Sequence, residues 1–187
     1  CWFKGILGDM ADLNARFLTG HVKIMSQAYA ENEDQIPNDL ALMGVNDLLD
    51  DLKRDNPEMT WYSRIKFGGL VDAPDENGET RAQGPAGGMA IDLLSGDRSE
   101  IERMNIESAL VRGELPDASM EILISDEFAE KLGVGPGDPV TLLGSTMYGG
   151  MAMQNFKIAG TLTFGIRMMD RGAIIVDIAD ARSVLDM

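Results

Sequence analysis

Cysteine and histidine are almost missing from this sequence, which has one of each, Cys1 and His21, among 187 residues. A single cysteine excludes an internal disulfide and a metal site built from several thiolates. A lone histidine is far more often a surface hydrogen-bonding residue than a general base or a metal ligand. No serine lies in a Gly-x-Ser-x-Gly pattern, which exposes the nucleophile of many hydrolases. We therefore expect no metal, no catalytic residues and no enzymatic activity; a hydrolase that uses paired carboxylates stays open.

Positive charge is also scarce. The 16 lysine and arginine residues are outnumbered by 31 aspartate and glutamate residues, which gives a net charge of −15. A nucleic-acid-binding protein needs clustered cations to neutralise phosphates, and an anionic membrane surface attracts cations in the same way. The charge balance therefore argues against a nucleic acid partner and against a protein that lies on an anionic membrane surface.

Long apolar runs and cofactor-binding loops are missing as well. No apolar run approaches the ~18 residues of a membrane-spanning helix. The first residues, CWFKGILGDM, have no initial Met, no basic region and no cleavage site, so they are not expected to form a signal peptide. The stretch GGLVDAPDENG lacks the Lys-Ser/Thr pair of a phosphate-binding loop, and GVGPGD does not have the pattern of a dinucleotide-binding loop. The acidic DAPDENGE lacks the ligand order of a calcium loop. We expect no cofactor.

The first part of the chain predicts a strand–helix–strand unit. Residues 22–28 alternate between apolar and polar side chains, which is typical of a half-buried strand. Residues 40–54 carry leucines on one helical face, with Asn38 or Asp39 as the N-cap and Asn56-Pro57 as the stop. Residues 59–73 alternate again, as in a long strand. We therefore expect a βαβ unit, followed by a tight turn at Asn77-Gly78 in an otherwise flexible stretch up to Gly88.

The second half is richer in expected strands. These strands cover residues 89–94, 122–124, 139–143, 156–164 and 173–176. Short helices are expected over 97–104 and 126–132, the latter between an N-cap at Ser125 and a C-cap at Gly133. A last helix begins at Asp177 or Asp180 and is cut off by the end of the chain. The whole, residues 1–187, is predicted to be one α+β domain in two lobes, excised from a longer protein.

Several motifs in the second half occur in a recognisable order. They are Glu121-Ile122-x-Ile124-Ser125, Leu132 to Val134, Gly137-Asp138, Val140 to Leu142, Phe156-x-Ile158-x-Gly160, and Ala179 or Ala181 with Leu185. In this order and spacing they resemble the extracytoplasmic (periplasmic) domain of MacB-like and FtsX-like ABC transporter permeases, including macrolide exporters and lipoprotein-releasing LolC/LolE-type permeases. The early LTGHVKI is similar to the first strand of that family. The resemblance covers most of residues 18–187 and is strongest over 110–187.

This resemblance implies a domain that lies between two transmembrane helices and performs no chemistry. It implies two lobes: a βαβ-containing lobe of residues 19–73 with 166–187, and an inserted β-rich lobe of 84–165. ATP hydrolysis would reside in a separate cytoplasmic ATPase. Its motion would be relayed across the inner membrane to the export of a substrate or the release of lipoproteins. The implied partners are that ATPase, a second permease copy or related chain, and a periplasmic adaptor or lipoprotein carrier.

The expected partner site is the Gly- and Met-rich link of residues 144–155. In lipoprotein-releasing permeases, a hairpin protrusion after the corresponding strand contacts the lipoprotein carrier. The predicted partner-binding residues here are Met147, Tyr148, Met151 and Met153. Methionine adapts to varied surfaces, and an exposed apolar loop needs a partner. The link departs from the family's protrusion because it is rich in glycine and has no proline; the alternative is that these side chains fold back onto the domain.

A different class of protein stays open. Cys1 is the residue that would carry the lipid of a lipid-anchored binding protein, and a secreted binding protein is possible on the same grounds. The apolar residues Trp2, Phe3, Ile6 and Leu7 would then lie next to the membrane, or they belong to a core helix.

Overall fold

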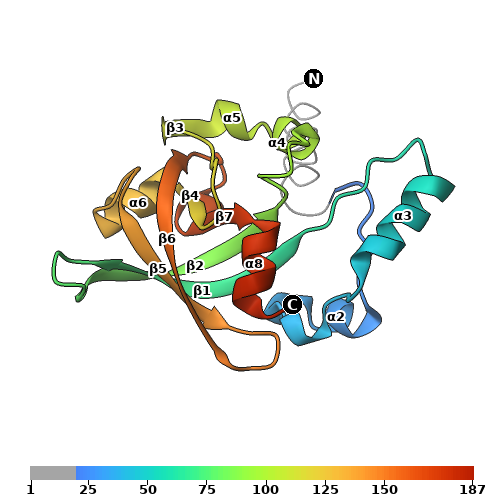
Figure 1. Cartoon of the computed structure of the whole chain (residues 1–187), viewed down its shortest axis with the longest axis horizontal. Coiled ribbons are helices and arrows are strands. Elements are labelled where there is room, and N and C mark those ends of the chain that lie inside the picture. The colour runs from blue at the N-terminus through green and yellow to red at the C-terminus, as the bar shows by residue number, and fades with distance from the viewer. Residues whose placement is uncertain (1–19) are drawn as a thin grey trace, which may run out of the picture.

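The computed structural model describes residues 20–187. Cys1 and the apolar residues that follow it therefore lie outside the described residues. The elements run in chain order as α2 (Gln27–Glu31), the 3-10 helices η2 (Glu33–Gln35) and η3 (Asn38–Leu40), α3 (Val45–Asp55), β1 (Ile65–Pro74), β2 (Thr80–Ile91), α4 (Ser99–Met104), α5 (Ile106–Ala109), β3 (Leu110–Gly113), β4 (Glu121–Ser125), α6 (Asp126–Leu132), β5 (Pro139–Ser145), β6 (Met151–Leu162), α7 (Arg167–Asp170), β7 (Ala173–Asp177) and α8 (Ile178–Leu185). Figure 1 shows their arrangement.

Six of the strands close into a barrel. Their order is β6-β4-β7-β2-β1-β5, and a further pairing between β5 and β6 completes the circle. Strand β6 allows the closure because its two halves have different partners. Met151–Lys157 runs antiparallel to β5, whereas Lys157–Leu162 runs parallel to β4. The short β3 adds an antiparallel seventh strand beside the second half of β6.

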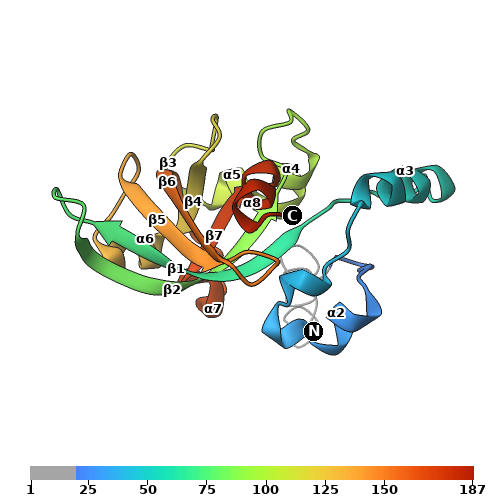
Figure 2. The same cartoon turned by 60° about the horizontal axis from the view of Figure 1, so that its bottom comes forward.

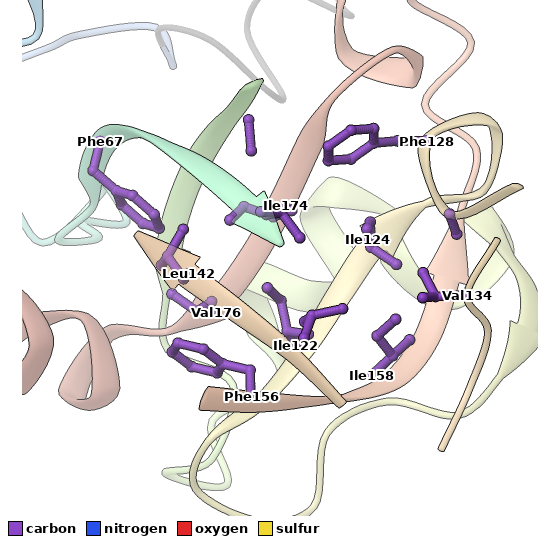
Figure 3. Packing of buried hydrophobic residues seen from close by; sticks show 14 of the residues in the cluster. Phe67, Ile122, Ile124, Phe128, Val134, Leu142, Phe156, Ile158, Ile174 and Val176 are labelled. Atoms are coloured by element: carbon purple, nitrogen blue, oxygen red, sulfur yellow. The ribbon is translucent and has the colours of Figure 1, made fainter. Parts of the chain in front are cut away.

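Alternate side chains of the strands fill the barrel interior. Side chains in a strand point to opposite faces in turn, so every second residue faces the same core. The interior cluster includes Phe67, Val71, Ile122, Ile124, Val140, Leu142, Phe156, Ile158, Ile174 and Val176, most of which Figure 3 labels. Helices α6 and α8 add Phe128 and Leu185 to this cluster, so both helices are held against the barrel by burial of apolar side chains.

A second core lies outside the barrel. The outward side chains Met89, Leu123 and Ile175 of β2, β4 and β7 pack with Ile101 and Met104 of α4. All five residues of β4 and all five of β7 are therefore buried. This explains why the sequence shows continuous apolar runs at these strands, since both of their faces are covered.

The predicted elements before β1 are largely wrong. Residues 22–28 form no strand; Val22 and Ile24 are exposed, and α2 begins inside this range. The alternating pattern finds no partner strand there, and Ser26 instead caps α2 by accepting a hydrogen bond from the Tyr29 amide at 3.0 Å. The structure accordingly has no βαβ unit over residues 20–73. Helix α3 begins at Val45 because Gly44 is left-handed, and it ends before Asn56 as predicted.

Three later expectations also need correction. Residues 80–88 are the first part of strand β2 and not a flexible stretch, although the predicted turn is confirmed, with Gly78 at φ +81°. Residues 151–155 belong to strand β6 and not to a loop. Helix α8 starts after Asp177, one of the two predicted caps, and ends at Leu185 with Asp186 in the left-handed conformation, so the chain end does not cut it.

The mixed α+β class is confirmed. Figures 1 and 2 show α2 and α3 to one side of the barrel. The β1–β5 and β4–β7 ladders join residues assigned to different lobes. The division into residues 19–73 with 166–187 and residues 84–165 therefore stays a prediction, and strands of both parts share one barrel.

The glycines of β2 provide a test of barrel packing. A Cβ on Gly88 would lie 2.1 Å from the ring of Phe67, its cross-strand partner, whereas a Cβ on Gly87 would meet nothing within 4 Å. We expect Gly88→Ala to lower the free energy of unfolding by about 1–3 kcal/mol, the usual cost of overpacking a core. Gly87→Ala, the matched control, should change it by less than about 0.5 kcal/mol. Urea unfolding followed by circular dichroism measures both, and equal values for the two variants would contradict this packing.

Candidate functional site

The β5–β6 hairpin contains the residues that the sequence analysis selected. The two strands pair without interruption from Pro139 opposite Lys157 to Ser145 opposite Met151. The turn between them is held at Thr146, whose amide donates to the Gly150 carbonyl at 2.8 Å and whose hydroxyl accepts from the Gly150 amide at 3.0 Å. Gly149 supplies the left-handed residue of the turn, with φ +79°. The glycine-rich stretch therefore forms a defined hairpin.

The structure brings three of the four predicted partner-binding residues to the surface and buries the fourth. Tyr148, Met151 and Met153 are 75%, 84% and 68% exposed, whereas Met147 is 8% exposed. The Met147 amide donates to the Leu185 carbonyl of α8 at 2.8 Å, so the chain folds back at this point. Met147 is therefore buried in this structure, which favours the alternative that its side chain folds back onto the domain; its partner contact stays an untested prediction.

Two further residues extend the exposed apolar surface. Leu70 of β1 lies opposite Leu143 of β5, which lies opposite Met153 of β6, so the three side chains form a row on the outer face of the barrel. Both leucines are half-buried. We call Leu70, Leu143, Tyr148, Met151 and Met153 the hairpin patch. The sequence analysis missed the leucines; the signal for them is that Val71 and Leu142 face inward, which turns their neighbours outward.

A cavity of about 1040 Å³ is the second candidate site. Its wall comes mainly from residues 20–66. Arg103 of α4 and three residues at the C-terminal end, Ile178, Arg182 and Met187, complete it. Helix α3 gives Val45, Leu48, Leu49 and Leu52 to this wall, and none of them is fully buried. The apolar face of the helix is thus turned to a cavity and not to a packed core.

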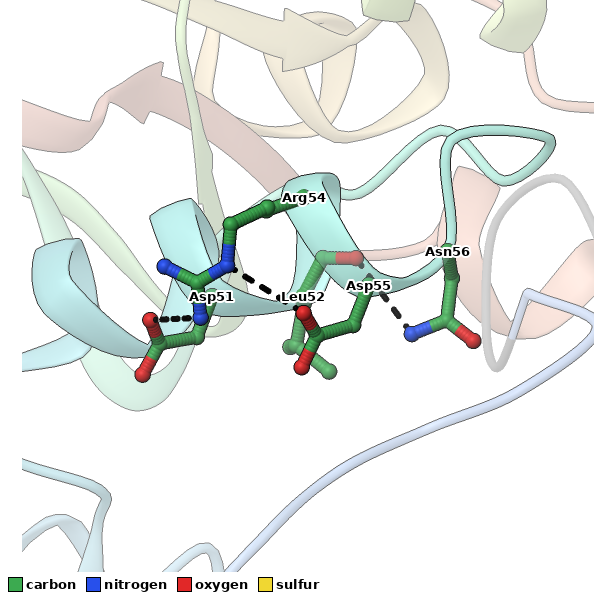
Figure 4. Close-up of polar contacts among 5 residues, drawn as sticks. All are labelled: Asp51, Leu52, Arg54, Asp55 and Asn56. Atoms are coloured by element: carbon green, nitrogen blue, oxygen red, sulfur yellow. Dashed lines mark hydrogen bonds and ion pairs between the residues drawn. The ribbon is translucent and has the colours of Figure 1, made fainter.

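The other side of α3 is polar. Arg54 donates to Asp51 at 2.7 Å and to Asp55 at 3.2 Å, and the Asn56 side chain donates to the Leu52 carbonyl at 3.3 Å (Figure 4). These contacts lie within the helix and its C-terminal cap, and they keep charged side chains on the face opposite the leucines.

The charges around the cavity differ from those of the chain as a whole. Five basic residues line it, with Glu58 as the sole acidic one among the described lining residues. The whole chain has 16 basic and 31 acidic residues, so acids would be expected to outnumber bases in a random sample of it. The five are Lys23, Arg64, Lys66, Arg103 and Arg182.

Two carboxylates behind the cavity wall partly balance these cations. Glu33 forms an ion pair with Lys23 and lies 4.0 Å from Lys66, and the Arg64 guanidinium donates to Glu100 at 2.6 Å. Burial lowers the pKa of Lys66, and the neighbouring cation Lys23 lowers it further. Burial also raises the pKa of Glu100 in spite of the ion pair with Arg64. Both shifts have burial as their largest cause, so these ion pairs lie in a partly desolvated part of the cavity wall.

Among the described residues, neither site contains a cluster of metal-ligating side chains. Over residues 20–187, no group of three or more histidine, cysteine, aspartate or glutamate side chains is placed to hold a metal ion. His21 lies at the cavity wall and is exposed. Within this same part of the chain, no helix combines the length and the apolar character needed to cross a bilayer.

Comparison with known proteins identifies no relative: no family model and no curated protein matches the sequence.

The difference in burial between Met147 and Met151 provides a second test. We expect Met147→Ala to lower the free energy of unfolding by about 2 kcal/mol or more, because it removes a buried side chain packed near α8. Met151→Ala, on the exposed face of the same hairpin, should change it by less than about 0.5 kcal/mol. Chemical denaturation compares the two. A large loss from Met151→Ala would show that the hairpin patch is covered.

Proposed function

We propose that this chain is the extracytoplasmic domain of an ABC transporter permease and that it works through contacts at the hairpin patch, without chemistry. The observation that carries the proposal is an exposed apolar patch on a rigid hairpin, at the position where the resembling permeases contact a partner. A monomeric protein rarely exposes large methionine and aromatic side chains together unless something binds them.

The positions of the sequence motifs support this assignment. The Glu121–Ser125 motif is strand β4, the Gly137-Asp138 motif is the turn before β5, and the Phe156 motif lies in β6. These elements pair directly with one another in the barrel. The motifs are therefore parts of one packed unit, which is what a scaffold without catalytic residues requires.

The hairpin is built to transmit movement. It is tied to β1 through the pairing of Gly69–Asp72 with Thr141–Gly144 and to α8 through the Met147 amide. A displacement at the C-terminal helix would move the hairpin with the barrel, because the packed core does not deform continuously. In this proposal, a separate ATPase drives the motion, and helices that span the cytoplasmic membrane carry it to this domain. A second permease copy lies beside the first. An adaptor or lipoprotein carrier binds the hairpin patch.

The division into two lobes, residues 19–73 with 166–187 and residues 84–165, forms part of the same proposal. Residues 20–64 contribute no strand to the barrel, and with α8 they surround the cavity. This segment is the part that can shift against the barrel as the transporter changes state. Ligands and partners change such an equilibrium only through contacts that differ between the two states.

The cavity favours a second candidate function, a binding protein that is secreted or anchored through Cys1. A cavity of this volume lies at the upper end of the range that small-molecule sites occupy. The two candidates differ in the neighbouring sequence of the full-length protein: membrane helices on both sides of this segment support the permease, and a lipid-attachment signal before Cys1 supports the binding protein.

Replacement of the exposed side chains in the intact transporter tests the permease proposal. We expect Tyr148→Ser combined with Met151→Ser and Met153→Ser to reduce partner binding and transport by about tenfold or more, because exposed apolar anchors dominate binding energy. The thermal stability of the domain should change little, since all three side chains are exposed.

The matched control removes apolar surface elsewhere. Val111→Ser with Met168→Ser changes two side chains that are 50% and 80% exposed outside the hairpin patch. This control should transport normally. Normal transport by the triple variant, with the domain folded and the full transporter assembled, would reject the hairpin patch as the working surface.

A further inference from the structure

We propose that the cavity beside α3 binds an anionic single-chain lipid, that is, one long hydrocarbon chain with a carboxylate head group. This inference concerns a site other than the hairpin patch and does not depend on the proposed permease function. It rests on the cavity volume, on the character of its wall and on the sign of the charge around it.

The wall provides the apolar part of the site. Leu48, Leu49 and Leu52 of α3 line the cavity, together with Trp61, which precedes β1, and Ile65, the first residue of β1. Methionines add adaptable surface, among them Met43 and Met59, which are 58% and 43% exposed. An amphipathic helix ordinarily turns its leucines to a packed core, so a half-buried leucine face over a cavity of about 1040 Å³ indicates an apolar occupant.

The charges specify the head group. Lys23, Arg64 and Lys66 stand together with the two carboxylates Glu33 and Glu100, which leaves one excess positive charge in this cluster. Arg182 of α8 lines the same cavity and forms no ion pair with any residue of 20–187. The protein as a whole has a net charge of −15, so the cations at the cavity are a local excess of positive charge, and this excess favours an anion at close range.

A carboxylate fits this arrangement better than a neutral head group. A carboxylate has two oxygen acceptors, and the lysine and arginine side chains around the cavity are all donors. Its negative charge would also oppose the repulsion between the neighbouring cations Lys23, Arg64 and Lys66. A neutral long-chain alcohol would fill the same apolar space without this gain, so the head group should decide the affinity.

The experiment compares three molecules with the same chain length on the delipidated 187-residue protein: palmitate, hexadecanol and hexadecyltrimethylammonium, all below their aggregation concentrations. Binding is followed by displacement of a fluorescent fatty acid and by the emission of Trp61, with Trp2→Phe as the background. We expect palmitate to bind about tenfold or more tightly than the alcohol and the cation to bind weakest. Added salt should weaken palmitate binding.

Variants locate the binding. Lys66→Gln with Arg182→Gln should lower the affinity for palmitate by about tenfold and leave the affinity for hexadecanol unchanged. Leu49→Gln should lower the affinity for both. The control Lys53→Gln with Lys131→Gln removes the same number of charges from residues that do not line the cavity, and should bind palmitate normally. Circular dichroism checks that each variant is folded.

Two results would overturn the proposal. Equal affinity for the three molecules would show nonspecific association with apolar surface. Palmitate affinity that is the same in the wild type and in the cavity variants would show this too. If the intact chain binds none of the three, but gains palmitate binding when Phe3→Ser and Leu7→Ser are introduced, the occupant is the chain's own first residues and not a lipid.

Discussion

The closure of the barrel by strand β6 is the constraint on which the rest of the structure depends. Lys157 marks the point where β6 changes partner, since it lies opposite both Pro139 of β5 and Glu121 of β4. Its amide donates to the Met120 carbonyl at 2.9 Å, and its ammonium group contacts Glu121 at 3.1 Å. A shift of β6 by one residue would turn Phe156 and Ile158 out of the core and Met153 into it. The register of one strand therefore fills the interior and creates the hairpin patch.

Buried carboxylates hold the loops around this barrel. Asp177 caps α8 through the Ala179 amide at 2.8 Å and also accepts from the Leu93 amide at 3.0 Å, which ties the end of β2 to the end of β7. Asp180 accepts from the Ser119 hydroxyl at 2.5 Å and the Met120 amide at 2.7 Å, and so supports a residue with φ +62° just before β4. Buried polar groups need such partners, and these acids satisfy backbone donors that the strands leave unpaired. Helix α8 is consequently fixed through both Asp177 and Asp180, and it joins the hairpin to the cavity wall.

The sequence was most informative where local chemistry decides the structure. Ser125, Gly133 and Gly137-Asp138 predicted the limits of α6 and the turn before β5 correctly. Gly133 and the turn depend on a few neighbouring residues, whereas the Ser125 hydroxyl donates to the Asp170 carbonyl at 2.8 Å and does not cap the helix. Alternation failed at residues 22–28, since the pattern of a half-buried strand has no meaning without a partner strand to pair with. Composition failed at residues 80–88, where glycines that are typical of a loop make room in the barrel for the rings of Phe128 and Phe67.

In the candidate sites, too, the sequence predicted features that depend on neighbouring residues and missed those that depend on distant ones. Three exposed hairpin residues were predicted because methionine and tyrosine in a glycine-rich link are unusual, but the burial of Met147 depends on α8, which lies far along the chain. The cavity was not predicted at all, because its cations come from separate stretches around Lys23, Arg64, Arg103 and Arg182 and are brought together only by the fold.

Native-state hydrogen exchange of the backbone amides tests the central claim, that one closed barrel carries both the hairpin and the helix α8. The account predicts that protected amides in β1, β2, β4, β5, β6 and β7 open together with a single free energy equal to that of global unfolding. If amides of β1 and β7 open as one unit and those of β2, β4, β5 and β6 open as another, the chain consists of two separable lobes and the barrel account is wrong.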